Sequence, residues 1–101
     1  MIDITPLIRF TLPNAFSPNS DGVNDFYIGK GNLGEASTFE MTIWNRYGEL
    51  IFKSTNPTIG WNGKKQNTGR NLPEGVYTVK VITKNSREEY VTHTNFINLI
   101  R

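Results

Sequence analysis

Hydrophobic and polar side chains alternate along several short stretches of the chain, a pattern typical of strands that bury one face. The clearest case is residues 39–44, where one face carries Phe39, Met41 and Ile43 and the other carries Trp44. After Gly75, the positions expected to face inward are Tyr77, Val79 and Val81. The pattern predicts strands at residues 7–12, 26–28, 39–44, 50–53, 76–83 and 90–100.

Turn-forming residues separate these stretches. Residues 45–48 (Asn-Arg-Tyr-Gly) join two alternating stretches and predict a hairpin. In the irregular region 54–74, Trp61 is expected to insert its indole at the edge of the core. A bulge near Asn95 is expected to shift the register of the last strand, because its apolar face is mixed. The fold expected from these features is all-β: an immunoglobulin-like antiparallel β-sandwich of about seven strands, in a single domain over residues 1–101.

Residues 12–25 contain the densest group of turn-forming side chains in the chain. Pro13 and Pro18 fix φ, Gly22 permits a positive φ, and the Asn and Asp side chains can bond their own backbone. Phe16 and Val23 are expected to tie this stretch to a core. A segment this stiff and polar is expected to form one ordered loop.

The same loop partly matches an EF-type calcium loop that begins at Ser17. The candidate calcium ligands are Asn19, Asp21, the carbonyl of Val23 and Asp25. The match fails at position 12 of the motif, where Ile28 stands in place of a bidentate Glu. Any calcium site is therefore expected to be weak, and the alternative is a self-bonded turn without metal. No other cofactor is expected.

Composition and charge narrow the classes of function. The net charge is +2, with the Lys and Arg residues scattered along the chain, which argues against nucleic acid as a partner. No apolar run approaches the length of a membrane span, so direct membrane insertion is not expected. The chain has no cysteine, so its stability has to come from the core, and thiol catalysis is excluded.

Side chains that could support catalysis are isolated from one another. His93 is the single histidine and lies in the middle of a predicted strand. Glu88 and Glu89 are adjacent, so their side chains point to opposite faces and cannot flank one bond. No nucleophile elbow, zinc-ligand set or phosphate-binding glycine loop is visible. Enzymatic activity and a small-molecule substrate are therefore not expected.

Trp44 and Tyr47 leave a second class of function open. Exposed rings on one sheet face stack on sugars in carbohydrate-binding modules, whereas a Trp44 that covers the far face or an edge is structural. A carbohydrate-binding or adhesion module is thus one alternative, and a structural spacer is another.

Four motifs occur in a fixed order: residues 13–25 (PNAFSPNSDGVND), 43–52 (IWNRYGELIF), 61–63 (WNG) and 72–77 (LPEGVY). Together they resemble the gliding-motility-associated C-terminal domain, the type B sorting domain of the type IX secretion system in the Bacteroidetes. The resemblance covers residues 10–101. The chain departs from the family pattern at Ser20, Tyr47, Asn62 and Glu74, where the family usually has Gly, Trp, Asp and Asp.

The resemblance implies a non-catalytic sorting signal. Such domains are attached to surface proteins, fold in the periplasm, and are recognised by outer-membrane components of the secretion machinery, including a PorP/SprF-like barrel. The implied location is the cell surface or the medium, and the chain is expected to be the C-terminal fragment of a larger secreted protein. The surfaces expected to be recognised are one loop, one turn and the final strand. Their candidate residues are Ser17, Asn19, Asp21, Asn24, Asp25, Arg46 and Tyr47.

Overall fold

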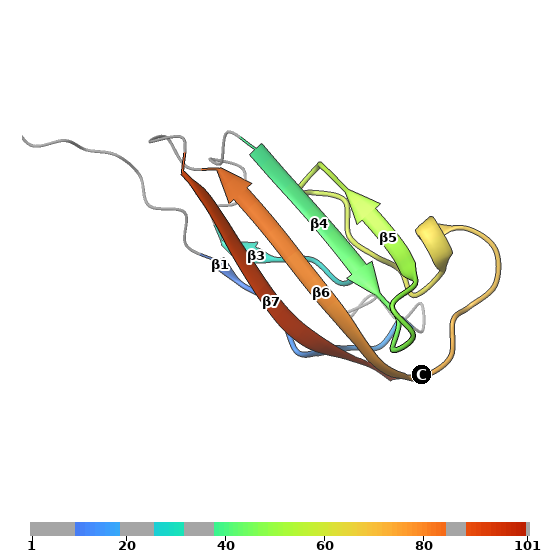
Figure 1. Ribbon diagram of the computed structural model, residues 1–101. Coiled ribbons are helices and arrows are strands. Elements are labelled where there is room, and N and C mark those ends of the chain that lie inside the picture. Colours follow the sequence, from blue (N-terminus) through green and yellow to red (C-terminus); the bar gives the residue numbers. More distant parts are fainter. Residues whose placement is uncertain (1–9, 19–25, 32–37, 85–88, 101) are drawn as a thin grey trace, which may run out of the picture.

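A computed structural model of the chain describes residues 10–18, 26–31, 38–84 and 89–100. These residues form the strands β1 (Phe10–Thr11), β2 (Ala15–Phe16), β3 (Lys30–Gly31), β4 (Thr38–Trp44), β5 (Leu50–Ser54), β6 (Gly75–Lys84) and β7 (Tyr90–Leu99) (Figure 1). A 3-10 turn, η2 (Lys65–Asn67), lies beside β5. The prediction of an all-β fold is confirmed. No helix in the described part of the chain is long and apolar enough to cross a membrane.

The strands form two sheets. The larger sheet has the order β2-β7-β6-β4-β5, and the smaller one pairs β1 with β3. All pairs are antiparallel except β2 with β7, which run parallel, with Phe16 opposite Leu99. β2 and β7, which lie near the two ends of the described chain, are therefore direct neighbours in the larger sheet.

Alternation places one face of the larger sheet in the core. Ile43 lies opposite Val79, and Met41 lies opposite Val81, so the apolar positions of β4 and β6 form one continuous surface. The inward positions predicted for these two strands are confirmed, because all of them are buried.

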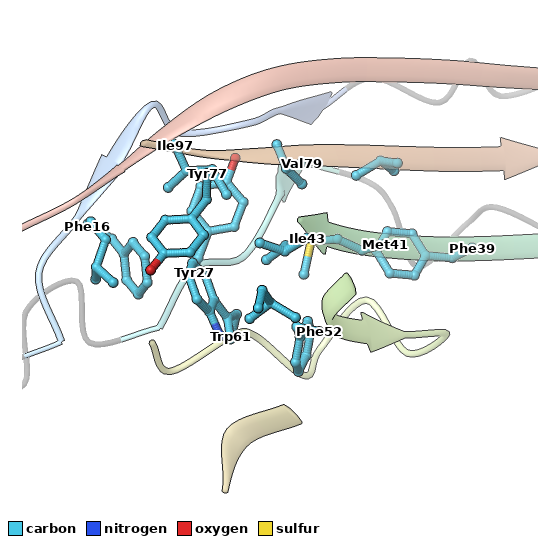
Figure 2. Packing of buried hydrophobic residues seen from close by; sticks show 13 residues of the cluster. Phe16, Tyr27, Phe39, Met41, Ile43, Phe52, Trp61, Tyr77, Val79 and Ile97 are labelled. Carbon is cyan, nitrogen blue, oxygen red and sulfur yellow. The ribbon is translucent and has the colours of Figure 1, made fainter. Parts of the chain in front are cut away.

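Aromatic side chains from the connecting segments cover this surface. Trp61 and Tyr27 are fully buried, and their backbones bond each other in both directions (N to O 2.7 and 2.9 Å). The Trp61 ring centroid lies 5.1 Å from those of Phe16 and Tyr77. Figure 2 shows these four rings gathered at one end of the cluster, while Met41 and Phe39 continue along β4. The predicted role of Trp61 as the anchor of its region is confirmed.

Gly60 makes the close approach of these segments possible. A Cβ at this position would lie 2.7 Å from the Tyr27 carbonyl oxygen. No side chain fits at that distance, so a larger residue would push Trp61 and Tyr27 apart.

Three short strands differ from the sequence prediction. Residues 26–28 contribute a single bridge at Tyr27, because only this residue enters the core while Phe26 is largely exposed. β3 lies instead at Lys30–Gly31, and β2 lies inside the segment that was expected to be a loop. Of the strand predicted at residues 7–12, the described part contains β1, and residues 7–9 lie outside the described residues.

The expected bulge near Asn95 was wrong. β7 pairs with β6 without a shift from Tyr90 to Leu99, and the irregularity lies between Ile43 and Trp44 on β4. The apolar pattern of β7 is mixed because Phe96 faces away from the core, where it is largely exposed.

The second face of the larger sheet is not covered by any described segment. Trp44, Thr78 and Phe96 lie side by side on it, as neighbours on adjacent strands. Figure 1 shows this face in front, with β1 and β3 behind the sheet.

Candidate docking surface at one end of the sheet

The turn between β4 and β5 is held by the side chain of Asn45. Its Oδ1 accepts hydrogen bonds from the backbone N–H groups of Tyr47 and Glu49, each at 2.9 Å. The backbone adds a bond from the Gly48 N–H to the Asn45 carbonyl (3.1 Å), and Gly48 has a φ of +80°, which favours glycine. The Glu49 carboxylate also contacts Lys65 Nζ at 3.1 Å. These bonds fix the turn relative to the sheet and to η2.

Arg46 and Tyr47 project from this rigid turn. The Tyr47 side chain is 79% exposed, and its hydroxyl accepts a hydrogen bond from Arg46 Nη2 at 2.8 Å. The Arg46 guanidinium also lies 5.0 Å from the centre of the Tyr47 ring. The pair therefore offers a cation and an aromatic ring at a fixed position, which suits recognition of a partner.

A shallow hollow of about 470 Å³ lies next to this pair on the uncovered sheet face. Its lining residues are Trp44, Asn45, Arg46, Gly48, Val76, Thr78 and Phe96. The Trp44 indole N–H donates to Thr42 Oγ1 at 3.1 Å, which holds the ring over the sheet. The hollow is mainly apolar with Arg46 at its rim, so it can take an apolar side chain next to an anionic group.

A smaller hollow of about 150 Å³ also has Arg46 in its lining. Its lining residues are Arg46, Tyr47, Pro73, Glu74, Gly75, Val76 and Tyr77. The Tyr77 hydroxyl donates a hydrogen bond to the Pro73 carbonyl oxygen (2.8 Å), and this bond fixes the segment before β6. Arg46 thus borders both hollows, and Tyr47 borders the smaller one.

The structure brings part of the expected recognition surface together. Ser17 follows Phe16, and Phe16 pairs with Leu99, which in turn pairs with Gly75. Ser17 therefore lies near the same end of the sheet as the Arg46–Tyr47 turn. The other expected recognition residues (Asn19, Asp21, Asn24 and Asp25) and the expected calcium ligand Val23 lie outside the described residues. The recognition role and the calcium site both stay predictions.

Sequence reasoning missed Val76 and Phe96, which line the larger hollow. The sequence contained a signal for both residues. Each one immediately precedes an inward-facing residue of its strand (Tyr77 or Ile97), and neighbouring residues along a strand point to opposite faces. Trp44 lies on the face opposite Phe39, Met41 and Ile43, as the alternation predicted.

The described residues hold no cluster of three or more His, Asp or Glu side chains that could bind a metal. His93 is exposed, and its ring packs edge-on against Phe10 with centroids 4.6 Å apart. Burial raises the pKa of Tyr27 above its ordinary value, so its phenol gives up a proton less readily than an exposed tyrosine does. Within the described part of the chain, no second group lies beside either residue in the arrangement that acid–base or nucleophilic catalysis needs.

The family model of the CHU_C type IX secretion signal domain matches residues 10–99. This range runs from the first residue of β1 to the last residue of β7. The chain belongs to this family. The resemblance found in the sequence motifs is thereby confirmed, and a type IX secretion signal indicates interaction with the secretion machinery and export to the cell surface or the medium. No curated protein matches the signal domain at a significant level.

Proposed function

We propose that the signal domain is recognised as one folded unit by the type IX secretion machinery and delivers an attached passenger to the cell surface or the medium. The observation that carries this proposal is the extent of the family match, which covers the whole folded unit from β1 to β7. Ala15 and Phe16 of β2 pair with Asn98 and Leu99 of β7. Because the two ends of the match are neighbours only after folding, this extent supports a signal that is read from the fold and not from a linear tail.

The proposed docking surface is the Arg46–Tyr47 pair with its two hollows. Fixed aromatic and Arg side chains at an apolar depression are typical of the residues that dominate binding energy in protein interfaces. The proposed partner is an outer-membrane component of the machinery, of the PorP/SprF-like class. The domain itself performs no chemistry in this proposal, and the membership in a secretion signal family favours such a non-catalytic role.

A graft tests the delivery function. Residues 1–101 are fused behind an N-terminal export signal and a fluorescent passenger, in a bacterium with the type IX machinery and in a mutant without it. Surface or medium fluorescence only in the intact strain supports the proposal. Periplasmic retention in both strains contradicts it, and a carbohydrate or adhesion assay of the isolated domain then follows.

Two variants of the graft separate folding from docking. Trp61→Ala removes a fully buried side chain at a cost of about 3–5 kcal/mol and should abolish export. Parental export of this variant would show that a linear segment is read. The double substitution Arg46→Ala and Tyr47→Ala removes only exposed groups, and it should reduce export while the melting temperature is kept. Arg70→Ala, which removes an exposed arginine elsewhere, is the matched control and should export normally.

We also propose a weak calcium site at Asn19, Asp21, Val23 and Asp25. The support is the partial match of this loop to the oxygen-ligand pattern of calcium sites. Calcium at roughly millimolar concentration should raise the melting temperature of the parent domain and leave an Asp21→Ala variant unchanged. An unchanged parent would refute the site.

A further inference from the structure

The larger sheet has two edges, and at the β5 edge a side chain bonds the backbone of Lys53. Gln66 lies beside β5 with its amide parallel to the strand. Its Oε1 accepts a hydrogen bond from the Lys53 N–H, and its Nε2 donates to the Lys53 carbonyl, both at 3.0 Å. The Gln66 amide thus occupies the place that the backbone of a further strand would take.

The edge at β7 is closed along its second half. The N–H groups of Asn98 and Ile100 donate to the carbonyls of Asn14 (2.8 Å) and Phe16 (3.0 Å). Nearer the middle of β7, the side chain of Asn95 makes the hydrogen bonds that a neighbouring strand would otherwise make. Its Oδ1 accepts from the Phe96 N–H at 2.9 Å, and its Nδ2 donates to the Leu12 carbonyl at 3.2 Å.

Along the first half of β7, residues 90–94, no described strand pairs with the side that faces away from β6. Backbone groups on a strand alternate in direction, and the N–H groups of Asn98 and Ile100 point away from β6. The pairing with β6 continues without a shift, so the N–H and C=O groups of Tyr90, Thr92 and Thr94 also point away from β6. No described residue bonds them. The segment Tyr-Val-Thr-His-Thr has high β propensity, no proline, and no Asp, Glu, Lys or Arg.

We propose that residues 90–94 of β7 are a strand-addition site for an extended, carboxylate-bearing segment of the secretion machinery. This proposal rests on the function proposed above and adds a second contact to the docking surface at the Arg46–Tyr47 turn. A row of outward N–H and C=O groups is satisfied by an extended backbone, which is the way in which partners add to exposed sheet edges.

The side chains around the open edge define the partner segment. On the uncovered sheet face, the exposed Lys80 lies opposite Thr94, whereas the half-buried Lys84 lies opposite Tyr90 and already contacts its ring (Nζ to ring centre 5.3 Å). The Glu40 carboxylate on this face already contacts Lys53 at 3.6 Å. A carboxylate on the partner segment would therefore face the positive charge of Lys80.

The other face of the open edge is apolar. It carries Val91, which is 39% exposed, and the His93 ring that packs against Phe10. The partner segment therefore alternates carboxylate side chains with apolar ones.

A second copy of the domain fits the edge less well. Antiparallel pairing of two β7 strands about Thr92 places Tyr90 opposite Thr94 of the other copy. Residues 90–99 contain no Asp or Glu, so this pairing places no carboxylate of the second β7 near Lys80. The charge of Lys80 thus favours an acidic segment of a different protein.

Thr92→Pro in the exported graft tests the backbone contact. This change removes an N–H group that does not bond β6, and proline is tolerated on an edge strand. Passenger export should fall about tenfold. Thr92→Val keeps the N–H group and the branched side chain, so it should export as the parent does.

Lys80→Glu tests the charge without changing the backbone. It should also reduce export several-fold, with Lys80→Arg as the matched control. This variant keeps the proposal testable if Thr92→Pro does not fold, which the circular dichroism and melting temperature of the purified domain will show.

The outcomes separate this inference from the proposed function. If the parent graft is exported and folded Thr92→Pro or Lys80→Glu is exported equally well, strand addition is overturned and the delivery function stays in place. A parent graft that is not exported overturns both. Purified parent domain that forms dimers, with Thr92→Pro monomeric by sedimentation, would show that a second copy occupies the edge and would also overturn the proposed partner.

Discussion

Tyr27 is fully buried, yet its hydroxyl has no hydrogen-bond partner among the described residues. An unpartnered buried hydroxyl loses its bonds to water on folding and receives nothing in return. Tyr77 is the natural comparison, because it is also buried in the same cluster but its hydroxyl donates to the Pro73 carbonyl. These two tyrosines differ in hydrogen bonding more than in burial.

Replacement of each tyrosine by phenylalanine should therefore have different effects. Tyr27→Phe should leave the free energy of unfolding unchanged or raise it by up to about 1 kcal/mol, whereas Tyr77→Phe should lower it by about 0.5–1.5 kcal/mol. Urea titrations of the two variants and the parent measure the difference. Equal losses in both variants would show that the Tyr27 hydroxyl has a partner.

The raised pKa of Tyr27 also predicts a dependence of stability on alkaline pH. The ordinary tyrosine pKa is 10.0, and burial raises that of Tyr27 in the folded state. Above pH 10 the unfolded chain loses this proton while the folded domain keeps it, so the unfolded state binds fewer protons and stability falls as pH rises.

The Tyr27→Phe variant isolates this effect. The difference in unfolding free energy between variant and parent should be constant below about pH 9 and should grow in favour of the variant above pH 10, by at most about 1.4 kcal/mol per pH unit. Urea titrations at increasing pH provide the measurement. A difference that stays constant at high pH would contradict the burial of the phenol.

At the scale of elements, the β4–β5 turn depends on one side chain. Asn45→Ala removes the acceptor of two backbone N–H groups, and it should lower the unfolding free energy by about 1–2 kcal/mol. Asn45→Asp keeps the acceptor and loses only the donor to Glu49, so it should lower the unfolding free energy by less than Asn45→Ala does. Thermal unfolding of both variants tests the order. An equal loss would place the stabilisation of the turn elsewhere.

The β5 edge depends on Gln66 in a similar way. Gln66→Ala opens the Lys53 backbone to other chains, so it should lower stability by about 1–2 kcal/mol and make the sedimentation behaviour depend on concentration. Gln66→Glu keeps the acceptor alone and should be intermediate. A fully monomeric Gln66→Ala variant at high concentration would show that the edge is protected by another feature.

The elements that the sequence predicted well are those with enough residues to show alternation. β4 and β6 have seven and ten residues, and the alternation of apolar and polar residues along them was enough to predict their inward faces. β1, β2 and β3 have two residues each, too few for a pattern, and they are held by pairing with distant strands. The roles of Gln66 and Asn95 depend on contacts with Lys53 and Leu12 that no local pattern contains.

The candidate docking surface was found in part for the same reason. The turn composition pointed to Arg46 and Tyr47, because turn residues are exposed and available to partners. The hollow beside them is formed by three strands, so it depends on the register that places Thr78 opposite both Trp44 and Phe96. Register follows from the completed sheet, which a single strand pattern does not determine.

At the scale of the whole molecule, the two ends of the described chain stabilise each other. A chain that stops after Phe96 lacks Ile97 and Leu99, which are 0% and 2% exposed, and it also lacks the residues that pair with β2. It should show no cooperative thermal unfolding, because two buried side chains represent about 3–6 kcal/mol. A chain that stops after Leu99 keeps these contacts and is the control. A folded shorter chain, detected by dispersed amide NMR signals, would contradict this account.

The parallel pairing of β2 with β7 has a consequence for the timing of export. β7 is the last strand to leave the ribosome, and the sheet lacks the central partner of β6 and β2 until it arrives. If the domain is read as a folded unit, as proposed above, a passenger whose domain is interrupted before β7 carries no readable signal, however much of the domain has already been made. The proposed signal would then become readable only once β7 has been made and has joined the sheet.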